Sequence, residues 1–346
     1  MAEKRDTTNQ AEMNQVPTVT CRATSLEIPR LSLGTMTFGG QADEATSRRM
    51  MDMAWDAGMF LFDTANIYNA GQSEEIIGRW IQDRFETEGQ GFRDRLILAS
   101  KVRGAMGEGP NRSGLSRRAI LAAVRDSLAR LKTDYLDIYY LHQPDYGTAI
   151  EESLQAMDDL IREGKIRYWA ISNYAAWQLA EILHLCEAMQ IPPPILTQNV
   201  YNVLTRGLEG ELLPLLNTHS RAPSLTVYNP LAGGLLTGKH KIDPLEGTRL
   251  ADNPMYNTRY WKPSYLKAAK SYVELAEKVG REPTSLAFAW LKAQPHVDSI
   301  LVGASKPEQL EQNLKAMEED VPSDEIKAEL DAIWLELSGD TFAYYR

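Results

Sequence analysis

The stretch ILAAVRDSLARLKTDYLDIYYLH, residues 120–142, decides the fold because it joins a helical pattern to a strand pattern. In its first half, apolar residues recur at the spacing of one helix face: Ile120, Val124, Leu128 and Leu131. The second half ends in an apolar and aromatic run, Ile138–His142, which is typical of a strand and closes on a polar side chain. A helix followed by a buried strand is the repeating unit of an α/β protein.

The same unit recurs along the chain. Apolar stripes at helical spacing also occur at residues 150–160 and 266–279, between short β-rich runs. There are eight such runs: Leu31–Thr35, Phe60–Asp63, Leu96–Lys101, Ile138–His142, Tyr168–Ser172, Ile195–Asn199, Leu225–Tyr228 and Ser299–Gly303. Eight strands that alternate with helices predict parallel βα units. An open doubly wound sheet could also hold them, but eight regular repeats favour a closed (β/α)8 TIM barrel.

One interval between strands is unusually long. Tyr228 and Gly303 are separated by more than twice the roughly 31 residues that one of eight units would occupy in a barrel of about 250 residues. Residues 232–262 are rich in Gly, Asn and basic side chains, which predicts a long loop over the barrel mouth after strand seven. No composition shift marks a boundary, so residues 17–346 are predicted to form a single domain. Residues 1–16 are predicted to be a disordered polar leader.

Composition excludes several classes of protein. The 346 residues are 43% hydrophobic, which is enough for a large core, and the formal net charge of −10 argues against nucleic-acid or anionic-membrane binding. Cys21 and Cys186 form no CxxC motif, so we expect a reducing compartment. The sequence shows neither a signal peptide nor an apolar run of 18 residues. We therefore expect a cytoplasmic protein with no membrane segment, and a homo-oligomer is compatible with the sequence.

Ionisable side chains end three consecutive predicted strands. Asp63, Lys101 and His142 stand at the carboxyl ends of strands two, three and four, and Tyr68 follows Asp63 by five residues. In a barrel these ends form the active-site face. Any one of them alone is more often a helix cap or a solvated surface group, so the prediction depends on their coincidence. No metal is expected, because the five histidines show no ligand spacing.

Together these residues make a proton donor. An ordinary phenol, with a pKa near 10, holds its proton too tightly for efficient transfer at neutral pH. A lysine ammonium beside Tyr68 would stabilise the phenolate, and a carboxylate would keep that lysine charged and oriented. A histidine could then position a carbonyl oxygen by a hydrogen bond.

The motifs around these residues resemble those of the aldo-keto reductases. They are Asp63-Thr64-Ala65-x-x-Tyr68, Ser100-Lys101, the stretch from Leu131 to His142, and Gly164-Lys165-Ile166-Arg167-Tyr168-Trp169-Ala170-Ile171-Ser172-Asn173. The likeness runs from about residue 31 to residue 313, with the motifs in family order. It implies a barrel that binds a nicotinamide cofactor without a Rossmann domain. It also implies a catalytic tetrad of Asp63, Tyr68, Lys101 and His142, with Tyr68 as the general acid in reduction.

The resemblance also assigns cofactor-binding positions. Ser172, Asn173 and Gln198 would hold the nicotinamide carboxamide, and Tyr228 would stack on the ring. After strand seven the matching positions are Asn229, Pro230, Leu231, Gly233, Lys239 and Arg259, with the last two near the pyrophosphate. The adenosine-phosphate segment matches at Gly303, Ser305, Lys306, Gln309 and Asn313. Gly233–Lys239 fits GxxxxGK, but position 240 is His rather than Ser or Thr, which argues against a P-loop.

The segment after the last strand has a physical interpretation of its own. Ser305 and Glu308 form an S-x-x-E pattern, which predicts a capping box at the start of a helix. Such a helix end, with Lys306 beside it, suits a phosphate. If Ser305 and Lys306 reach the ribose 2′-phosphate, the cofactor is NADPH rather than NADH; otherwise Ser305 only caps the helix and Lys306 is solvated. Many members of the family have Arg where Gln309 stands, so NADPH preference is expected to be less strict.

The leading hypothesis is an NADPH-dependent reductase of an aldehyde or ketone. Within the family, residues 228–239, 259–262 and 344–346 look like the aflatoxin-aldehyde and succinic-semialdehyde reductase subgroup. Phe38, Tyr68, Trp261 and the C-terminal tail could line a pocket for bulky or xenobiotic carbonyl compounds. The main alternative is a cofactor-loaded regulatory binding protein resembling potassium-channel β subunits. A third hypothesis is a barrel that acts on phosphorylated sugars, but it does not explain Ser172, Asn173 and Gln198.

Overall fold

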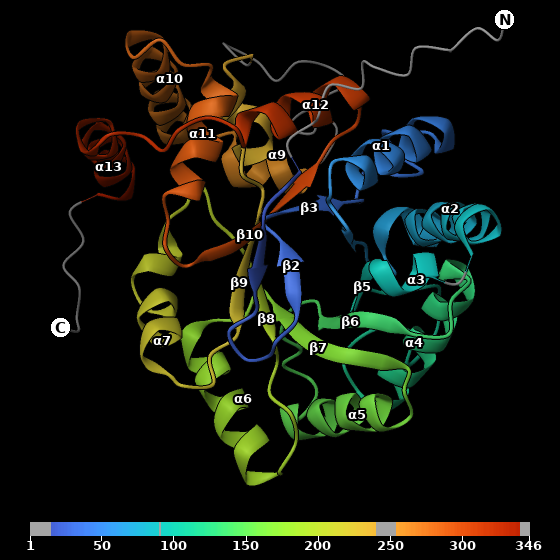
Figure 1. Ribbon diagram of the computed structural model, residues 1–346. Coiled ribbons are helices and arrows are strands. Elements are labelled where there is room, and N and C mark those ends of the chain that lie inside the picture. The colour runs from blue at the N-terminus through green and yellow to red at the C-terminus, as the bar shows by residue number, and fades with distance from the viewer. Residues whose placement is uncertain (1–14, 90, 240–253, 340–346) are drawn as a thin grey trace, which may run out of the picture.

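Eight parallel strands close into a barrel in the computed structural model, which describes residues 15–89, 91–239 and 254–339 (Figure 1). Around the barrel the order is β10-β3-β4-β5-β6-β7-β8-β9. The strands are β3 (Leu31–Gly34), β4 (Leu61–Asp63), β5 (Ile97–Val102), β6 (Leu136–Leu141), β7 (Ile166–Ser172), β8 (Leu196–Val200), β9 (Ser224–Tyr228) and β10 (Val297–Gly303). Each matches one of the eight predicted runs, so the (β/α)8 fold is confirmed.

Helices cover the outside of this barrel, as Figure 1 shows. Those along the first six strands are α1 (Glu44–Asp56), α2 (Gln72–Glu88), α3 (Gly91–Arg95), α4 (Arg117–Leu131), α5 (Ile150–Arg162), α6 (Ala176–Ala188) and α7 (Leu212–Thr218). The later ones are α9 (Pro254–Tyr260), α10 (Pro263–Lys278), α11 (Pro283–Lys292), α12 (Pro307–Ala316) and α13 (Asp324–Ser338). Short 3₁₀ turns are η1 (Tyr68–Gly71), η2 (Gly207–Glu209) and η3 (Ala232–Thr237).

The predicted long loop over residues 232–262 is therefore partly wrong, because it contains η3 and α9. Left-handed Gly233 and Gly234 interrupt η3, and α9 is only seven residues long. Neither gives a clear helical period in the sequence.

The helix pattern that opened the sequence argument is α4. Ser116 caps its start by accepting a hydrogen bond from the Ala119 amide, and Lys132 ends it with a left-handed φ of 53°. Its apolar stripe is buried against the barrel: Ile120, Val124, Leu128 and Leu131. The following strand β6 is buried on both faces over residues 138–141, because a parallel strand is covered by helices outside and by the barrel interior inside.

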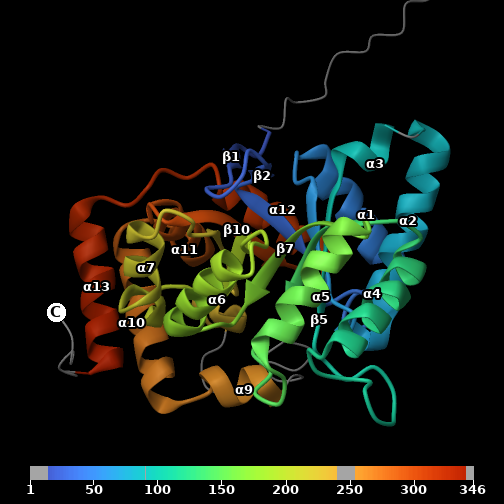
Figure 2. The same cartoon turned by 90° about the horizontal axis from the view of Figure 1, so that it is seen from below.

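A two-stranded hairpin, which the sequence analysis did not predict, covers the amino-terminal end of the barrel. It consists of antiparallel β1 (Thr18–Thr20) and β2 (Glu27–Pro29). Cys21 and Ile28 pack on residues at or near the starts of barrel strands, including Leu61 and Ile97. Figure 2 shows the hairpin at one end of the barrel and α9 at the opposite end. The hairpin therefore leaves the carboxyl-terminal end of the barrel, where the sequence predicts the active site, uncovered.

The hairpin lies close to the residues expected to form the leader. Val16, inside the expected leader, is buried, and its amide donates to the Ala57 carbonyl at 2.9 Å. Gln15 Nε2 donates to the Asp56 carbonyl at 3.1 Å. Residues 1–14 lie outside the described part of the chain.

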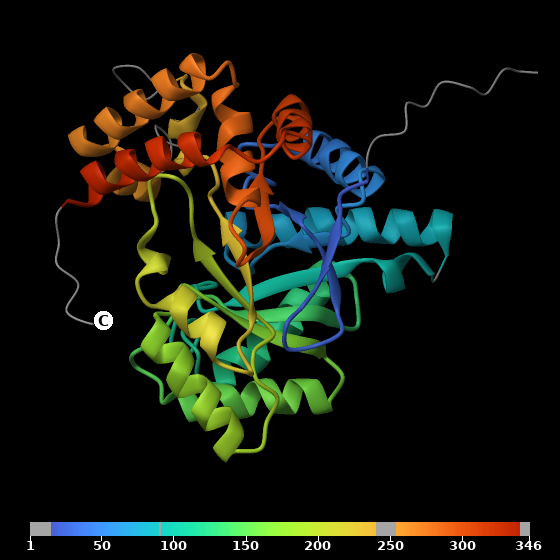
Figure 3. The same cartoon turned by 60° about the vertical axis from the view of Figure 1, so that its left-hand side comes forward.

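The C-terminal helices extend the wall beside β9 and β10. In Figure 3, α13, in red and leading toward the C-terminus, lies alongside the orange α10. Lys278 of α10 forms an ion pair with Glu329 of α13 at 2.8 Å. Surface ion pairs of this kind contribute at most about 1 kcal/mol each, so apolar packing sets the position of α13. Residues 340–346, including the predicted aromatic tail, lie outside the described residues.

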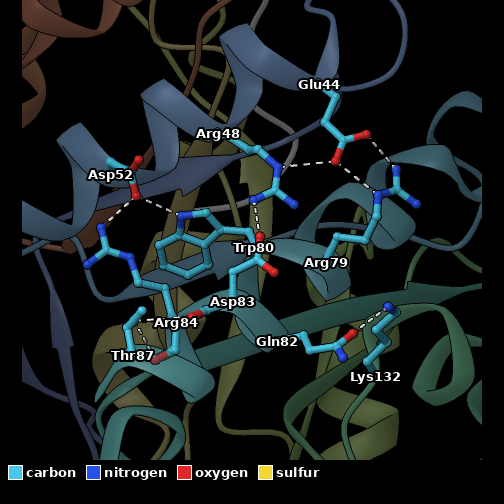
Figure 4. A network of polar contacts seen from close by, with 10 residues as sticks. All are labelled: Glu44, Arg48, Asp52, Arg79, Trp80, Gln82, Asp83, Arg84, Thr87 and Lys132. Carbon is cyan, nitrogen blue, oxygen red and sulfur yellow. Dashed lines mark hydrogen bonds and ion pairs between the residues drawn. The ribbon is translucent and has the colours of Figure 1, made fainter. Parts of the chain in front are cut away.

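Charged side chains join α1 to α2 (Figure 4). The Glu44 carboxylate accepts two hydrogen bonds from Arg79, both at 2.9 Å. Asp52 accepts from the Trp80 indole at 2.8 Å and from Arg84 at 2.5 Å. These pairs join the helix that follows β4 to the helix that follows β3.

Candidate active site

A cavity of about 710 Å³ opens at the carboxyl-terminal end of the barrel. Its lining includes ten of the residues that the sequence singled out: Asp63, Tyr68, His142, Ser172, Asn173, Gln198, Tyr228, Asn229, Arg259 and Gly303. They come from loops and strand ends that are far apart in sequence, and the barrel brings them together. Its size is that of a site for a small molecule or a cofactor.

Lys101 is fully buried next to two residues of the cavity lining, Asp63 and Tyr68. Its Nζ donates to the Asp63 carboxylate, to the Thr64 carbonyl at 2.9 Å and to the Tyr68 hydroxyl at 3.2 Å. The other oxygen of Asp63 accepts from Gln198 Nε2 at 2.9 Å. Burial by itself would lower the pKa of Lys101, but the Asp63 carboxylate and the Tyr68 oxygen outweigh it and hold that pKa above its ordinary value. The ammonium is therefore charged at neutral pH and points at the phenol.

A strained turn returns Tyr68 to the strand ends. Tyr68 begins η1, and the next two residues, Asn69 and Ala70, both have left-handed φ values of 48° and 56°. The Asn69 amide secures this turn by donating to the carbonyls of Met36 at 3.0 Å and Phe38 at 2.7 Å. Strain that the surroundings hold in place is typical of positioned functional groups.

His142 lies on the other side of Tyr68, at the end of β6. The two rings meet edge to face with centroids 5.9 Å apart. Burial, with the cations of Lys101 and Arg103 nearby, lowers the pKa of His142 to about 3. The imidazole is therefore neutral at physiological pH and can donate one hydrogen bond to a ligand oxygen without being an acid itself.

The side-chain amides at the ends of β7 and β8 form a connected group. Asn173, with a left-handed φ of 64°, donates to the His142 carbonyl and to Ser172 Oγ, both at 3.0 Å. Its oxygen accepts from the Tyr228 hydroxyl at 2.7 Å. Ser172 Oγ donates to the Gln198 carbonyl at 2.8 Å. This wall of the cavity offers hydroxyl and amide groups at fixed positions, as recognition of a flat polar group requires.

Asn229 braces the segment that follows β9. It donates to the Tyr260 hydroxyl at 2.6 Å and accepts from the Gly233 amide at 2.7 Å. The Gly233 amide is thus used within the protein. Pro230 is buried and Leu231 partly buried, and both lie behind the cavity surface.

Comparison with known proteins identifies the family of this chain. The model of the aldo/keto reductase family matches residues 30–334. The chain belongs to the aldo/keto reductase family. It is therefore an oxidoreductase of a family whose members typically use NAD(P)H.

Relatives within the aldo/keto reductases carry two kinds of name. The human "Aflatoxin B1 aldehyde reductase member 2" is 35% identical over 84% of this chain and 83% of its own. The "Probable voltage-gated potassium channel subunit beta" of Oryza sativa subsp. japonica is 34% identical over 85% of this chain and 88% of its own. "Protein tas" of Escherichia coli (strain K12) is 33% identical over 89% of this chain and 95% of its own.

The predicted capping box at Ser305 and Glu308 is wrong. Helix α12 begins at Pro307, so its N-cap is Lys306, which makes no side-chain cap. Proline suits the first helical position because it lacks the amide hydrogen, and this places the start one residue later than the S-x-x-E pattern implied. Gln309 replaces Glu308 in the reaching-back role, accepting from the Ser305 amide at 2.9 Å and from Ser305 Oγ at 3.2 Å.

The rest of the predicted cofactor segment lies around this helix start. Lys306 is exposed, and Asn313 is buried about two turns further along α12. Lys239, also exposed, lies after η3 and outside the cavity lining. Residues 240–253 lie outside the described residues, so the structure places only the ends of that segment.

Several residues differ from their predicted roles or were not predicted at all. Phe38 is fully buried in the core instead of lining the cavity, and Trp261 packs against that core. Arg103 and Gln143 do line the cavity. The rule that strand ends form the site could have found them, because they lie two residues after Lys101 and one after His142. Among the helices of the described residues, none has the length and apolarity to cross a bilayer.

Proposed function

We propose that this aldo/keto reductase reduces an aldehyde or ketone to an alcohol with NADPH, using Tyr68 as the general acid. The observation that carries the proposal is the buried chain from Asp63 through Lys101 to the Tyr68 hydroxyl, which opens into the cavity. A charged donor to the phenol oxygen favours the phenolate, so it eases the release of the proton.

The residues around the cavity suit a nicotinamide cofactor. Ser172, Asn173 and Gln198 present hydroxyl and amide groups along one wall, and the Tyr228 ring stands next to them. Arg259 lines the cavity on the same side and suits a pyrophosphate, and Lys306 at the start of α12 suits the 2′-phosphate. When bound there, NADPH supplies the hydride.

The proton is delivered by residues of the chain itself. A carbonyl oxygen between Tyr68 and His142 would accept hydrogen bonds from the phenol and from the neutral imidazole, and both strengthen as negative charge grows on that oxygen. Tyr68 then gives its proton to the oxygen. Lys101, held by Asp63, stabilises the phenolate that remains until solvent returns the proton.

The cavity volume favours a bulky carbonyl compound over a very small one. About 710 Å³ is enough for a cofactor head and a ring-sized substrate together. Met36 and Ile67 give the mouth apolar surface. Aromatic aldehydes are therefore the first substrates to test, and xenobiotic carbonyl compounds belong to the same class.

A regulatory subunit that holds the cofactor without turnover is the second candidate. It is favoured by the names of relatives such as the Oryza channel subunit. Turnover separates the two functions. Purified protein should consume NADPH, seen as loss of absorbance at 340 nm, when 4-nitrobenzaldehyde is added, and NADH should serve less well. NADPH binding, measured by fluorescence, without aldehyde-dependent consumption would favour the regulatory subunit.

A further inference from the structure

Arg103 gives the proposed active site a cation that the proton-transfer chain does not use. It follows β5 directly and lines the cavity together with Gln143 and His142. Resting on the proposed function, we propose that Arg103 is the substrate-anchoring residue and that the preferred substrates are anionic carbonyl compounds. Their carboxylate or phosphate group would bind the guanidinium while the carbonyl lies at Tyr68.

The guanidinium is available for such a group. Among the described residues, no carboxylate lies within 4 Å of the Arg103 nitrogens. With its oxygen facing the guanidinium, the Gln143 amide accepts from Nε at 3.3 Å and from Nη1 at 2.5 Å. Arginine carries five N–H donors, so Nη2 keeps its donors for a ligand.

The neighbouring acid is already occupied. Asp145 accepts from the Leu115 amide at 2.7 Å, the Gly147 amide at 3.1 Å and the Thr148 hydroxyl at 2.8 Å. Its oxygens thus hold the loop that follows β6; the carboxylate feels the charge of Arg103 but forms no ion pair with it within 4 Å. A cation that is partly buried, supported by a neutral amide and without an ion pair within 4 Å among the described residues is suited to an incoming anion.

The barrel order separates this cation from the proposed cofactor wall. β5 lies four strands from β9 in the eight-strand ring, so Arg103 stands across the cavity from the segment that carries Arg259. Two cations can therefore serve two ligands. In a chain with a net charge of −10, the cavity would attract anions although the surface as a whole repels them.

The same order places Arg103 near the expected position of the carbonyl group. Arg103 follows the strand between those that carry Tyr68 and His142, and neighbouring strands lie about 4.8 Å apart. The anion should therefore be no more than about one aromatic ring from the carbonyl carbon. 4-Carboxybenzaldehyde meets this condition, and methyl 4-formylbenzoate is its neutral counterpart.

The test measures kcat/KM for this pair, and for 4-formylphenyl phosphate, in wild type and three variants. Arg103→Gln should lower kcat/KM for the anionic aldehydes roughly 10- to 100-fold more than it lowers kcat/KM for the ester, with the difference mainly in KM. Arg103→Lys should recover part of the loss. Arg112→Gln is the matched control, because Arg112 lies in the same β5–α4 segment, outside the cavity lining, with its side chain 52% exposed.

A binding measurement keeps the anion site separate from catalysis. Terephthalate has no reducible aldehyde, and its titration by calorimetry, with and without NADP⁺, should show roughly tenfold or greater weakening in Arg103→Gln and none in Arg112→Gln. Equal effects of Arg103→Gln on the acid and the ester, or unchanged terephthalate binding, would overturn the proposal while leaving carbonyl reduction intact. If wild type reduces no aldehyde, the proposed function fails and terephthalate binding still decides the anion site. A greater loss for the phosphate than for the carboxylate would show that Arg103 prefers a phosphate group.

Discussion

Replacing Lys101 with methionine tests the proton-transfer chain most directly. The substitution removes the ammonium and keeps an unbranched side chain of similar length, so the buried space stays filled. Three interactions are lost: those with the Asp63 carboxylate, the Thr64 carbonyl and the Tyr68 hydroxyl. The Asp63 carboxylate then remains buried with Gln198 as its hydrogen-bond partner.

The loss of stability and the loss of rate can be sized separately. Removing one partner of a buried ion pair costs about 3–5 kcal/mol, a large part of the 5–15 kcal/mol that stabilises an ordinary domain. General acid catalysis is worth about 10²–10⁴ in rate, and we expect reduction to fall by that factor. The remaining activity should depend on pH differently from wild type, because the phenol no longer has a cation beside it.

Adding Asp63→Asn separates the two effects. The double variant removes both charges, and the asparagine oxygen can still accept from Gln198, so the free energy of unfolding should recover most of the loss. Reduction should not recover. Urea unfolding followed by circular dichroism measures stability, and single-turnover loss of NADPH absorbance with a saturating aldehyde measures the chemical step. If Lys101→Met reduces aldehydes at nearly the wild-type rate with an unchanged pH profile, Tyr68 receives no help from Lys101 and the reasoning fails.

Three other predictions test neighbouring parts of the site. Tyr68→Phe should lower reduction about 10²–10⁴-fold and leave NADPH affinity nearly unchanged; turnover within threefold of wild type at saturating substrate would reject Tyr68 as the acid. Lys306→Ala should weaken NADPH roughly tenfold or more and NADH much less, and equal losses measured by fluorescence titration would place Lys306 away from the 2′-phosphate. His142 has a pKa of about 3 when folded and about 6.5 when unfolded, so the unfolded chain binds the extra proton and wild type loses stability as pH falls below 6.5. Between pH 7 and pH 5 wild type should lose about 2 kcal/mol more than His142→Gln in urea unfolding, and parallel losses would show that His142 titrates normally.

The sequence could predict the barrel because its signals are repeated. Apolar runs such as the one that begins at Ile138 are buried on both faces, and eight runs between amphipathic helices leave few alternatives. Three residues at strand ends, with Tyr68 beside them, could be predicted for the same reason, since parallel strands bring their carboxyl ends together.

Other features depend on contacts that one sequence does not reveal. The hairpin strands β1 and β2 have three residues each, too few for a periodic pattern, and the barrel end they cover stabilises them. Helix α12 begins one residue later than predicted because Pro307 takes the first helical position. Phe38 is an aromatic residue of the kind that often lines a pocket, and only the fold shows that its side chain is buried in the core.

The distribution of left-handed backbone has a consequence for how this protein can change. Of the nine non-glycine residues with positive φ in the described part of the chain, seven lie in segments that follow a barrel strand; the exceptions are Lys132 and Gln190, which follow helices. Such a conformation costs an alanine about 1 kcal/mol or more and an asparagine less, so the loops at the carboxyl-terminal end of the barrel store strain. Replacing Ala70 or Ala232 with glycine would relieve this strain, because glycine adopts a positive φ readily. The same substitution would make the turn more flexible. The packed strands of the barrel stabilise the protein enough to hold these strained loops. Substitutions in the loops can therefore change the cavity while the strands keep their structure.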